Sequence, residues 1–392
     1  MTLRDYTANV ISASKVVPDG AFQDSAASGV WDINEALDLI KGGNWPTTGN
    51  FNPAAFVDGL FQTHVYDGNG GTQSIVNNID LSGSGGLVWT KRRDSSSNGD
   101  HTLYDTERGT GTGGRLRSNN NQQAYSPTDA VTAFNNNGFS IGADASINTN
   151  GAEYVSWTFR KQPKFFDIVT YTGNGTAGRT ISHNLGSVPG FIIVKRLNGS
   201  DNWTCYHRGV DSTAPEDYIL YLNDTAARSD QDLWADTAPT SSVFSVGDNI
   251  KVNGSSSNTY VAYLFAHNNS DGGFGTDSED IIKCGSYTGS SSDVSVDLGF
   301  EPQFVIVKNA STTSNWLMMD VMRGMPHGDG ETLAADKSTA ENGTFGTDNL
   351  INPTASGFIA KTGKTASNNN GSTHIYVAIR RPDMSTPTVA SE

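Results

Sequence analysis

The feature that most constrains this chain is an internal repeat, in which the same motifs occur three times in the same order. The stretches 87–92, 191–196 and 304–308 each carry a short apolar run that leads into a lysine. The copies begin 104 residues apart, at 87 and 191, and then 113 residues apart, at 191 and 304. Solenoid repeats have periods of about 20–50 residues, whereas a period above about 100 residues is the size of a domain. The chain is therefore predicted to contain three similar domains in tandem.

Two further motifs follow each of these stretches. One is an Arg-Gly pair, which we interpret as an arginine that binds turn carbonyls inside each domain, because fold constraints are copied more faithfully than binding sites. The other is a Tyr-Val pair, which marks the last strand of each copy. These motifs begin at Arg108, Arg208 and Arg323, and at Tyr154, Tyr260 and Tyr376.

Composition predicts strands rather than helices. Glycine accounts for 43 residues and charged residues for 17% of the chain. The apolar runs are short and rich in Val, Ile, Tyr and Phe, a pattern typical of strands separated by turns. Each repeat holds seven or eight such runs within about 105 residues, as an antiparallel β-sandwich does. We therefore expect an all-β protein of three tandem antiparallel β-sandwich domains behind an N-terminal arm.

The domain boundaries follow from where the motifs begin and end. Pro163 lies in a short first junction and predicts rigid packing of the first two domains. The Asn-, Ser- and Gly-rich stretch 267–273 has the composition of a flexible linker and predicts that the third domain can pivot. The predicted parts are an arm at 1–60, sandwiches at 61–161, 162–268 and 275–382, and a C-terminal tail at 383–392.

The arm contains the one convincing helix signal, at residues 33–41. Asp32 and Glu35 form a capping-box pattern, and Gly42 with Gly43 would end the helix. A helix of about ten residues is not stable alone in water, so its apolar side must be buried against a partner. We predict that this side attaches the protein to an assembly. The predicted attachment residues are Trp31, Ile33, Leu37, Ile40 and Trp45.

Charge and cysteine usage exclude several classes of partner. The formal net charge of −15 disfavours nucleic-acid binding, which needs a basic surface, and adsorption to an anionic membrane. No apolar run approaches the ~18 residues of a membrane-spanning helix, so no membrane insertion is expected. Cys205 and Cys284 fall at different positions of different repeats, and no disulfide framework is expected.

Residues that could carry catalysis show no organised pattern. The seven histidines are dispersed and lack the spacing of metal ligands. Neighbouring acids such as Glu279 and Asp280 have the character of solvated pairs. We therefore expect no enzymatic activity, no cofactor and no bound metal.

A second interpretation of the strand before the Arg-Gly pair is a sugar-binding platform. Aromatic rings can stack on a sugar ring while neighbouring polar groups bind its hydroxyls. The candidate platform residues are Trp203, Tyr206 and Trp316. Burial in the core is the alternative.

The repeat resembles a domain of tandem-repeat, tail-fibre-like structural proteins of tailed bacteriophages of the marine and cyanobacterial type. The resemblance lies in the stretches 86–92, 104–109, 137–142 and 154–157, and in 166–175 with 183–186 of the second copy. The motif Asp-Thr-x-Arg-Gly, at residues 105–109, is complete only in the first copy. The domain is also similar to lectin-like jelly-roll sandwiches, which implies that fold for each repeat.

The resemblance implies a virion structural protein that is assembled in the host cytoplasm, most simply a tail fibre or tail-associated protein. It would bind other virion proteins through the arm and recognise a host-surface glycan through the sandwiches. A homo-oligomer is expected, with a trimer as the default, because a slender fibre needs lateral support. A capsid-surface (head-decoration) protein and a free carbohydrate-binding module protein are the alternatives.

Overall fold

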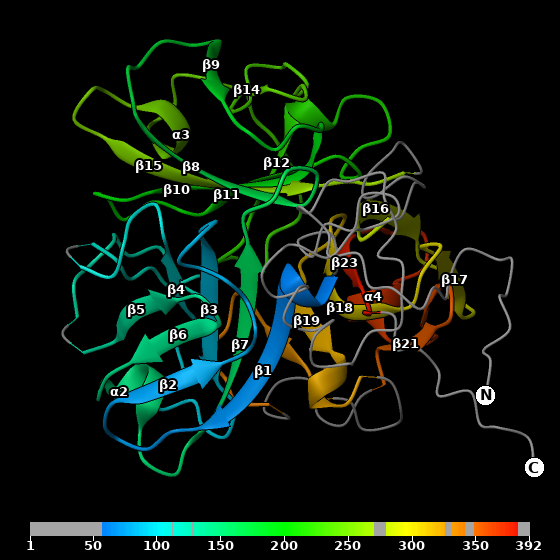
Figure 1. Cartoon of the computed structure of the whole chain (residues 1–392). Coiled ribbons are helices and arrows are strands. Elements are labelled where there is room, and N and C mark those ends of the chain that lie inside the picture. Colours follow the sequence, from blue (N-terminus) through cyan, green and yellow to red (C-terminus); the bar gives the residue numbers. More distant parts are fainter. Residues whose placement is uncertain are drawn as a thin grey trace, which may run out of the picture.

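A computed structural model describes residues 57–111, 113–127, 129–269, 280–325, 331–341 and 349–382 (Figure 1). The described chain is all-β, with antiparallel sheets and only short helices, as the composition predicted. None of the helices within these ranges is long and apolar enough to cross a membrane. The predicted helix 33–41 and the tail 383–392 lie outside the described residues.

The first unit, from η2 to β7, contains a larger and a smaller sheet. The larger sheet has the order β1 (Phe61–Asp67), β7 (Glu153–Arg160), β3 (Gly86–Arg92), β4 (Thr102–Asp105). The smaller sheet has the order β2 (Gln73–Val76), β6 (Gly138–Ile141), β5 (Val131–Asn135). The short helices are η2 (Val57–Gly59) and α2 (Ala145–Asn148).

The second unit, from β8 to β15, repeats this arrangement. Its larger sheet has the order β8 (Phe166–Thr172), β15 (Thr259–Ala266), β10 (Pro189–Arg196), β11 (Thr204–His207), β12 (Tyr218–Tyr221), β13 (Ser229–Asp230). The smaller sheet pairs β9 (Arg179–Ser182) with β14 (Val243–Val246). The short helices are η3 (Pro215–Asp217) and α3 (Ile250–Asn253).

The third unit, from β16 to β23, has the same core order. Its larger sheet runs β16 (Ile282–Thr288), β23 (Thr373–Arg380), β18 (Pro302–Asn309), β19 (Trp316–Asp320), β20 (Leu333–Ala334). Its smaller sheet runs β17 (Val294–Asp297), β22 (Gly357–Ala360), β21 (Ile351–Thr354). The short helices are η4 (Val321–Arg323) and α4 (Thr365–Asn368).

Each larger sheet is buried on both faces, which explains its apolar strands. In β3, Val88 packs in the core that the larger sheet shares with the smaller sheet, together with Phe139 of β6. Leu87 and Trp89 point to the opposite face and join a second core. Side chains alternate between the faces of a strand, so a strand covered on both sides reads as a continuous apolar run.

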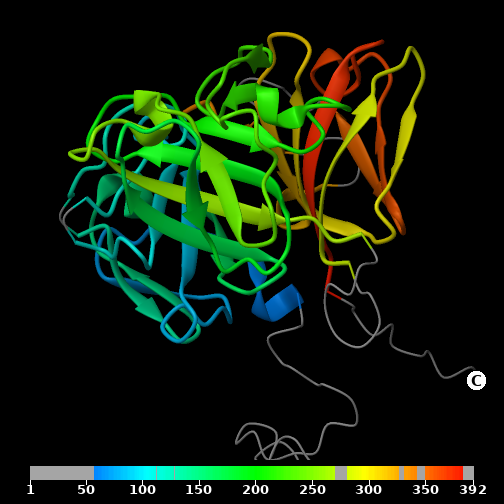
Figure 2. The same ribbon diagram turned by 90° about the horizontal axis from the view of Figure 1, so that it is seen from above.

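The second core is shared by all three units and forms a hub. Rows of side chains on neighbouring strands of the three larger sheets meet there. The ring centroid of Phe159 in the first unit lies 5.5 Å from that of Phe265 in the second unit and 6.2 Å from that of Phe304 in the third. The hub residues are Phe61, Leu87, Phe159, Phe166, Phe191, Phe265, Ile282, Phe304 and Ile379. The three units therefore close on one another, as the two views of the ribbon show (Figures 1 and 2).

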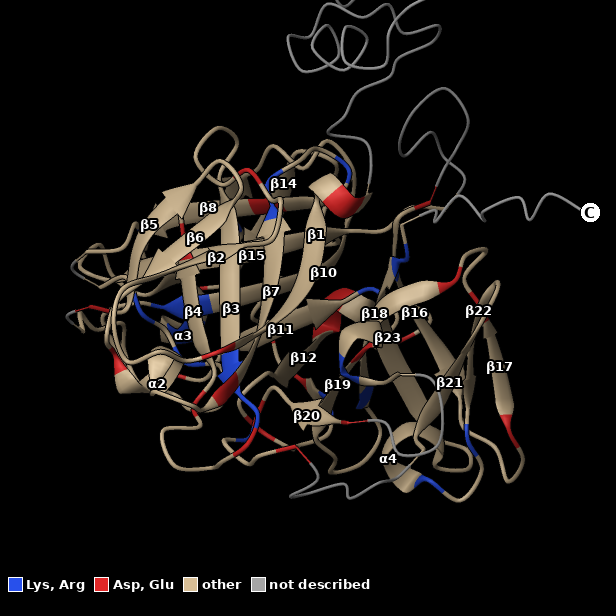
Figure 3. Cartoon of the chain, turned by 60° about the horizontal axis from the view of Figure 1, so that its bottom comes forward, with Lys and Arg blue, Asp and Glu red and all other residues tan. Residues whose placement is uncertain are grey.

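The shared hub overturns the expectation that the third unit pivots on a linker. Each described unit contacts both of the others, and removing any one would expose the apolar face of the remaining two. Figure 3 shows that the inner strands are uncharged along most of their length and that charges gather in loops and at strand ends. This distribution suits the contact of three apolar sheet faces.

Register corrects one sequence motif. Tyr154 pairs with Tyr66 and Tyr260 with Tyr171, but their counterpart in the third unit is His374, which pairs with Tyr287. Tyr376 was therefore aligned two residues too far along β23. A slip of two residues keeps every side chain on the same face of a strand, so the apolar pattern could not detect it.

Candidate functional site

Three equivalent lysines connect the units in a ring. Lys91, Lys195 and Lys308 occupy the same position on β3, β10 and β18, and all are fully buried. Each Nζ donates to a backbone carbonyl of another unit: Lys91 to Ser338 O at 3.3 Å, Lys195 to Asn121 O at 3.2 Å, and Lys308 to Thr225 O at 3.0 Å. Burial lowers the pKa of each lysine to about 8. The first unit thus bonds to the third, the second to the first, and the third to the second.

A second ring of contacts uses aromatic side chains that begin or precede β4, β11 and β19. The ring nitrogen of each donates to a carbonyl of the neighbouring unit at 2.9 Å: His101 Nε2 to Ala334 O, Trp203 Nε1 to Arg117 O, and Trp316 Nε1 to Tyr221 O. Trp203 and Trp316 are 0% and 1% exposed. A ring with no free face cannot stack on a sugar, so the predicted platform on these two tryptophans was wrong and the core alternative holds.

Two of the three junctions also bury a carboxylate and an arginine. At the first, Asp105 Oδ2 accepts from Arg108 Nε at 2.6 Å and from the Tyr263 hydroxyl of the second unit at 2.7 Å. Arg108 donates to the same hydroxyl at 3.2 Å. The side chains of Asp105 and Arg108 are 0% and 5% exposed. A junction in which a buried aspartate binds both an arginine of its own unit and an aromatic side chain of the next unit is called an Asp-Arg junction.

The junction between the third and first units has the same construction. Asp320 Oδ2 accepts from Arg323 Nε at 2.6 Å and from Trp157 Nε1 at 3.0 Å, and the Arg323 guanidinium lies 5.2 Å from the Trp157 ring centroid. Glu341 adds a second carboxylate 3.0 Å from Arg323. Burial would raise the pKa of Glu341, but hydrogen bonding to Glu331 and the neighbouring arginines lower it to about 2.

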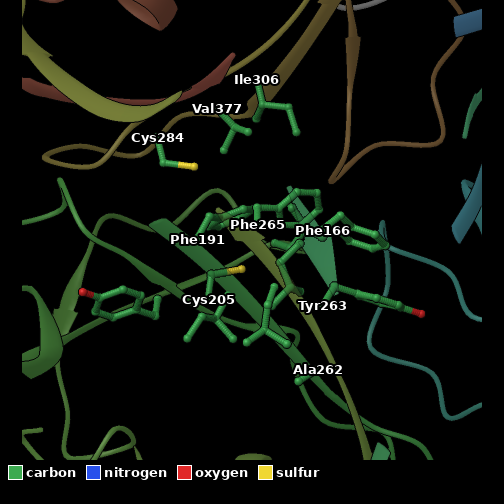
Figure 4. Packing of buried hydrophobic residues seen from close by; sticks show 14 of the residues in the cluster. Phe166, Phe191, Cys205, Ala262, Tyr263, Phe265, Cys284, Ile306 and Val377 are labelled. Atoms are coloured by element: carbon green, nitrogen blue, oxygen red, sulfur yellow. The ribbon is translucent and has the colours of Figure 1, made fainter. Parts of the chain in front are cut away.

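The junction between the second and third units lacks this construction. His207 occupies the place of Asp105 and Asp320, because it pairs with Phe191 on β10 as they pair with Leu87 and Phe304. The partner residue is the apolar Val377 instead of Trp157 or Tyr263. In Figure 4, Val377, Ile306 and Cys284 of the third unit face Phe191 and Phe265 of the second.

His207 is neutral in this setting. Its Nε2 donates to Tyr376 O at 3.0 Å, and its Nδ1 accepts from the backbone of Gly209 at 3.1 Å. Burial lowers the pKa of His207 to about 3. A neutral imidazole therefore replaces the buried ion pair, and among the described residues no carboxylate stands at this position for an arginine to bind.

Arg208 is displaced as a consequence. The turn places arginine three residues after Asp105 or Asp320 but only one residue after His207. Arg208 is exposed, whereas Arg108 and Arg323 bind turn carbonyls and an aspartate. The interpretation of a turn-binding arginine therefore holds for two copies and is wrong for Arg208.

Arg208 lines a pocket of about 610 Å³ on the second unit. The pocket lies beside the junction between the second and third units, which is called the third junction below. Lys164 and His267 contribute two more basic side chains, and Tyr206 lies in the wall. None of the described residues that line this pocket is Asp or Glu. A volume of this size falls within the usual range for small-ligand sites. Of the three predicted platform residues, Tyr206 borders this pocket. It is 4% exposed, so its ring is not free to stack on a sugar either.

Other candidate chemistry gives no site in the described part of the chain. No group of three or more His, Cys, Asp or Glu side chains is placed to hold a metal ion among the residues described. Cys205 and Cys284 are buried free thiols, and burial raises the pKa of both. The predicted attachment residues Trp31, Ile33, Leu37, Ile40 and Trp45 lie outside the described residues.

Comparison with protein families gives one match, to a domain of unknown function (DUF7483), across residues 58–381. Comparisons with curated proteins and with solved structures gave no match. The family match begins in η2 and ends just after β23, so it spans all three units and the hub between them. The three units are thus matched together, and the chain belongs to the DUF7483 family.

Proposed function

We propose that this protein is a non-enzymatic structural component of a tailed-phage particle, most simply a tail-fibre or tail-associated protein, that recognises a host-surface glycan. The single observation that carries recognition is the basic pocket beside the third junction, on an otherwise acidic protein. The resemblance of the repeats to tail-fibre-like proteins supports the location in a virion. The arm 1–60 attaches the body to other virion proteins in this proposal.

The fold proposed for each unit is a lectin-like jelly-roll sandwich. The packing of Val88 and Tyr154 against Ile75 and Phe139, between the larger and smaller sheets, supports a two-sheet sandwich in the first unit. The third unit has an equivalent core that includes Val305.

The proposed oligomer is a homotrimer that binds neither nucleic acid nor membrane. The expectation came from the lateral support that a slender fibre needs. The three units of one chain already support one another, so the body does not need further copies for lateral support. In this proposal, contacts of the arm therefore determine the number of copies in the oligomer. Light scattering of the full-length protein gives the number directly.

The location is tested with antibodies against the body on particles of the phage that encodes this chain. Gold labelling at the tail supports the proposal, labelling over the capsid surface supports a head-decoration protein, and protein found only free in the lysate supports a carbohydrate-binding module. Deletion of residues 1–50 is expected to abolish incorporation while leaving the body folded. Normal incorporation of this variant would place attachment on the body.

A further inference from the structure

At the third junction, the charged side chain of Arg208 forms no contact of the kind that Arg108 and Arg323 form in the other two junctions. The guanidinium of Arg208 forms no hydrogen bond or ion pair with any residue in the described ranges, although Arg108 and Arg323 each bind an aspartate. A structural arginine at this turn is explained by burial and pairing. Arg208 has neither, and its position in the wall of a pocket requires another explanation.

The rest of the wall suits an anion on a polar body with apolar edges. Lys164 and His267 add basic groups, while Pro215 and Pro239 provide rigid apolar surface. Ser187 also lines the pocket, and its Oγ is buried without a hydrogen-bond partner among described residues.

Backbone strain lies at the same place. Lys164 has φ +65°, in the left-handed region that favours glycine, and its N–H donates to Leu185 O at 2.6 Å. A lysine in this conformation is less stable than glycine would be, and strained residues cluster at ligand-binding sites. The pocket therefore keeps a basic side chain at a position that the fold alone would assign to glycine.

We infer that this pocket binds an acidic saccharide, with the carboxylate of a uronic-acid-like sugar held by Arg208. This inference rests on the proposed function and names its ligand class. The planar guanidinium matches a carboxylate with two parallel hydrogen bonds. Lys164 strengthens the positive field, and the cavity of about 610 Å³ accommodates one or two sugar rings.

The test is calorimetric titration of the full-length protein with digalacturonic acid, with galactobiose as the neutral counterpart and inorganic phosphate as the free anion. We expect the acidic disaccharide to bind at least tenfold more tightly than galactobiose, and more weakly at 300 mM than at 50 mM salt, a screening effect. Arg208→Gln should raise its Kd at least tenfold. Arg208→Lys should recover only part of the loss, because lysine is a point charge.

Two further variants separate binding from folding and from net charge. Lys164→Gly should weaken binding several-fold while leaving the unfolding transition unchanged or higher, because glycine accepts the φ of +65°. Lys361→Gln removes the same charge on the third unit, at an exposed pair with Asp293, and should leave the Kd within twofold.

The inference is overturned if the acidic disaccharide gives no binding at millimolar concentration, if galactobiose binds equally well, or if Arg208→Gln leaves the Kd unchanged. Binding of phosphate alone would also overturn it, by identifying a free-anion site. Labelling of particles tests the proposed function independently. If the protein is found on the tail but does not bind the disaccharide, only this inference is overturned. If the protein binds the disaccharide but is absent from particles, only the proposed location in the virion is overturned.

Discussion

At the scale of single residues, one sequence motif performs two different tasks in this chain. Arg108 and Arg323 lie buried against Asp105 and Asp320 and bind the next unit, whereas Arg208 is exposed in a pocket. The difference arises from a shorter turn and from His207 in the position of the aspartate. Identity of residue type therefore does not imply identity of environment.

The two arginines provide a matched pair of variants. Arg323→Gln should lower the free energy of unfolding by about 3–5 kcal/mol, because it leaves Asp320 and Glu341 buried without their cation. Arg208→Gln should change it by less than about 0.5 kcal/mol, as is usual for an exposed side chain. Urea unfolding followed by tryptophan fluorescence measures both. Equal effects of the two variants would show that the Asp-Arg junctions do not stabilise the fold.

Buried histidines predict acid sensitivity. His207 has a folded pKa of about 3, whereas an unfolded histidine titrates near 6.5, so the unfolded chain binds more protons between these values. This contribution is fully present above about pH 6.5 and is lost as the pH falls towards 3. Between pH 7.5 and 5 the free energy of unfolding should fall by about 2 kcal/mol per such histidine.

His207→Gln is the control for this pH dependence. Glutamine can donate to Tyr376 O but does not titrate, so the fall between pH 7.5 and 5 should shrink by about 2 kcal/mol. Burial also lowers the pKa of His101. The contribution of His101 to the pH dependence of the free energy of unfolding should therefore remain in this variant. An unchanged pH dependence would mean that His207 titrates with the same pKa in the folded and the unfolded chain.

At the scale of elements, close contacts between strands determine where glycine is required. A Cβ on Gly138, at the start of β6, would lie 2.0 Å from Ile75 O of β2, and the residue has φ +145°. A Cβ on Gly151 would meet nothing within 4 Å, although φ is +72°. Backbone conformation and close approach can therefore be separated in one unit.

This pair predicts unequal effects of one substitution. Gly151→Ala should cost about 1 kcal/mol, the usual strain of a non-glycine residue in the left-handed region. Gly138→Ala should cost at least about 2 kcal/mol more, because β2 and β6 must move apart. Thermal unfolding of both variants gives the comparison. Similar losses would indicate that the smaller sheet is free to adjust.

At the scale of the whole molecule, the hub makes three repeats into one cooperative body. Larger sheets from all three units contribute to the same core, and the Lys91, Lys195 and Lys308 bonds run from unit to unit in a ring. Independent tandem domains would each carry a complete core of their own. Here the outer apolar face of each larger sheet is covered only when the neighbouring units are present.

Calorimetry should therefore show a single unfolding transition for the body. Phe304→Ala, at the hub, should lower the free energy of unfolding by about 3–5 kcal/mol and move the whole transition, because the cavity is shared by three units. Val305→Ala, one residue along β18 in the core of the third unit, is the control inside a single unit. Two or three separate transitions would contradict the shared core.

Sequence alone determined the strand content, the three-fold recurrence and the equivalence of Lys91, Lys195 and Lys308, because these depend on local apolar patterns and on copied motifs. Only the tertiary structure decided the slip at Tyr376, the burial of Trp203 and Trp316, and the displacement of Arg208. A strand pattern with a period of two does not distinguish a slip of two residues, and an apolar strand reads the same whether a sheet or another unit covers it. The pocket is lined by residues of the second unit that lie as far apart in the sequence as Lys164 and Asn269, and no local pattern encodes their meeting.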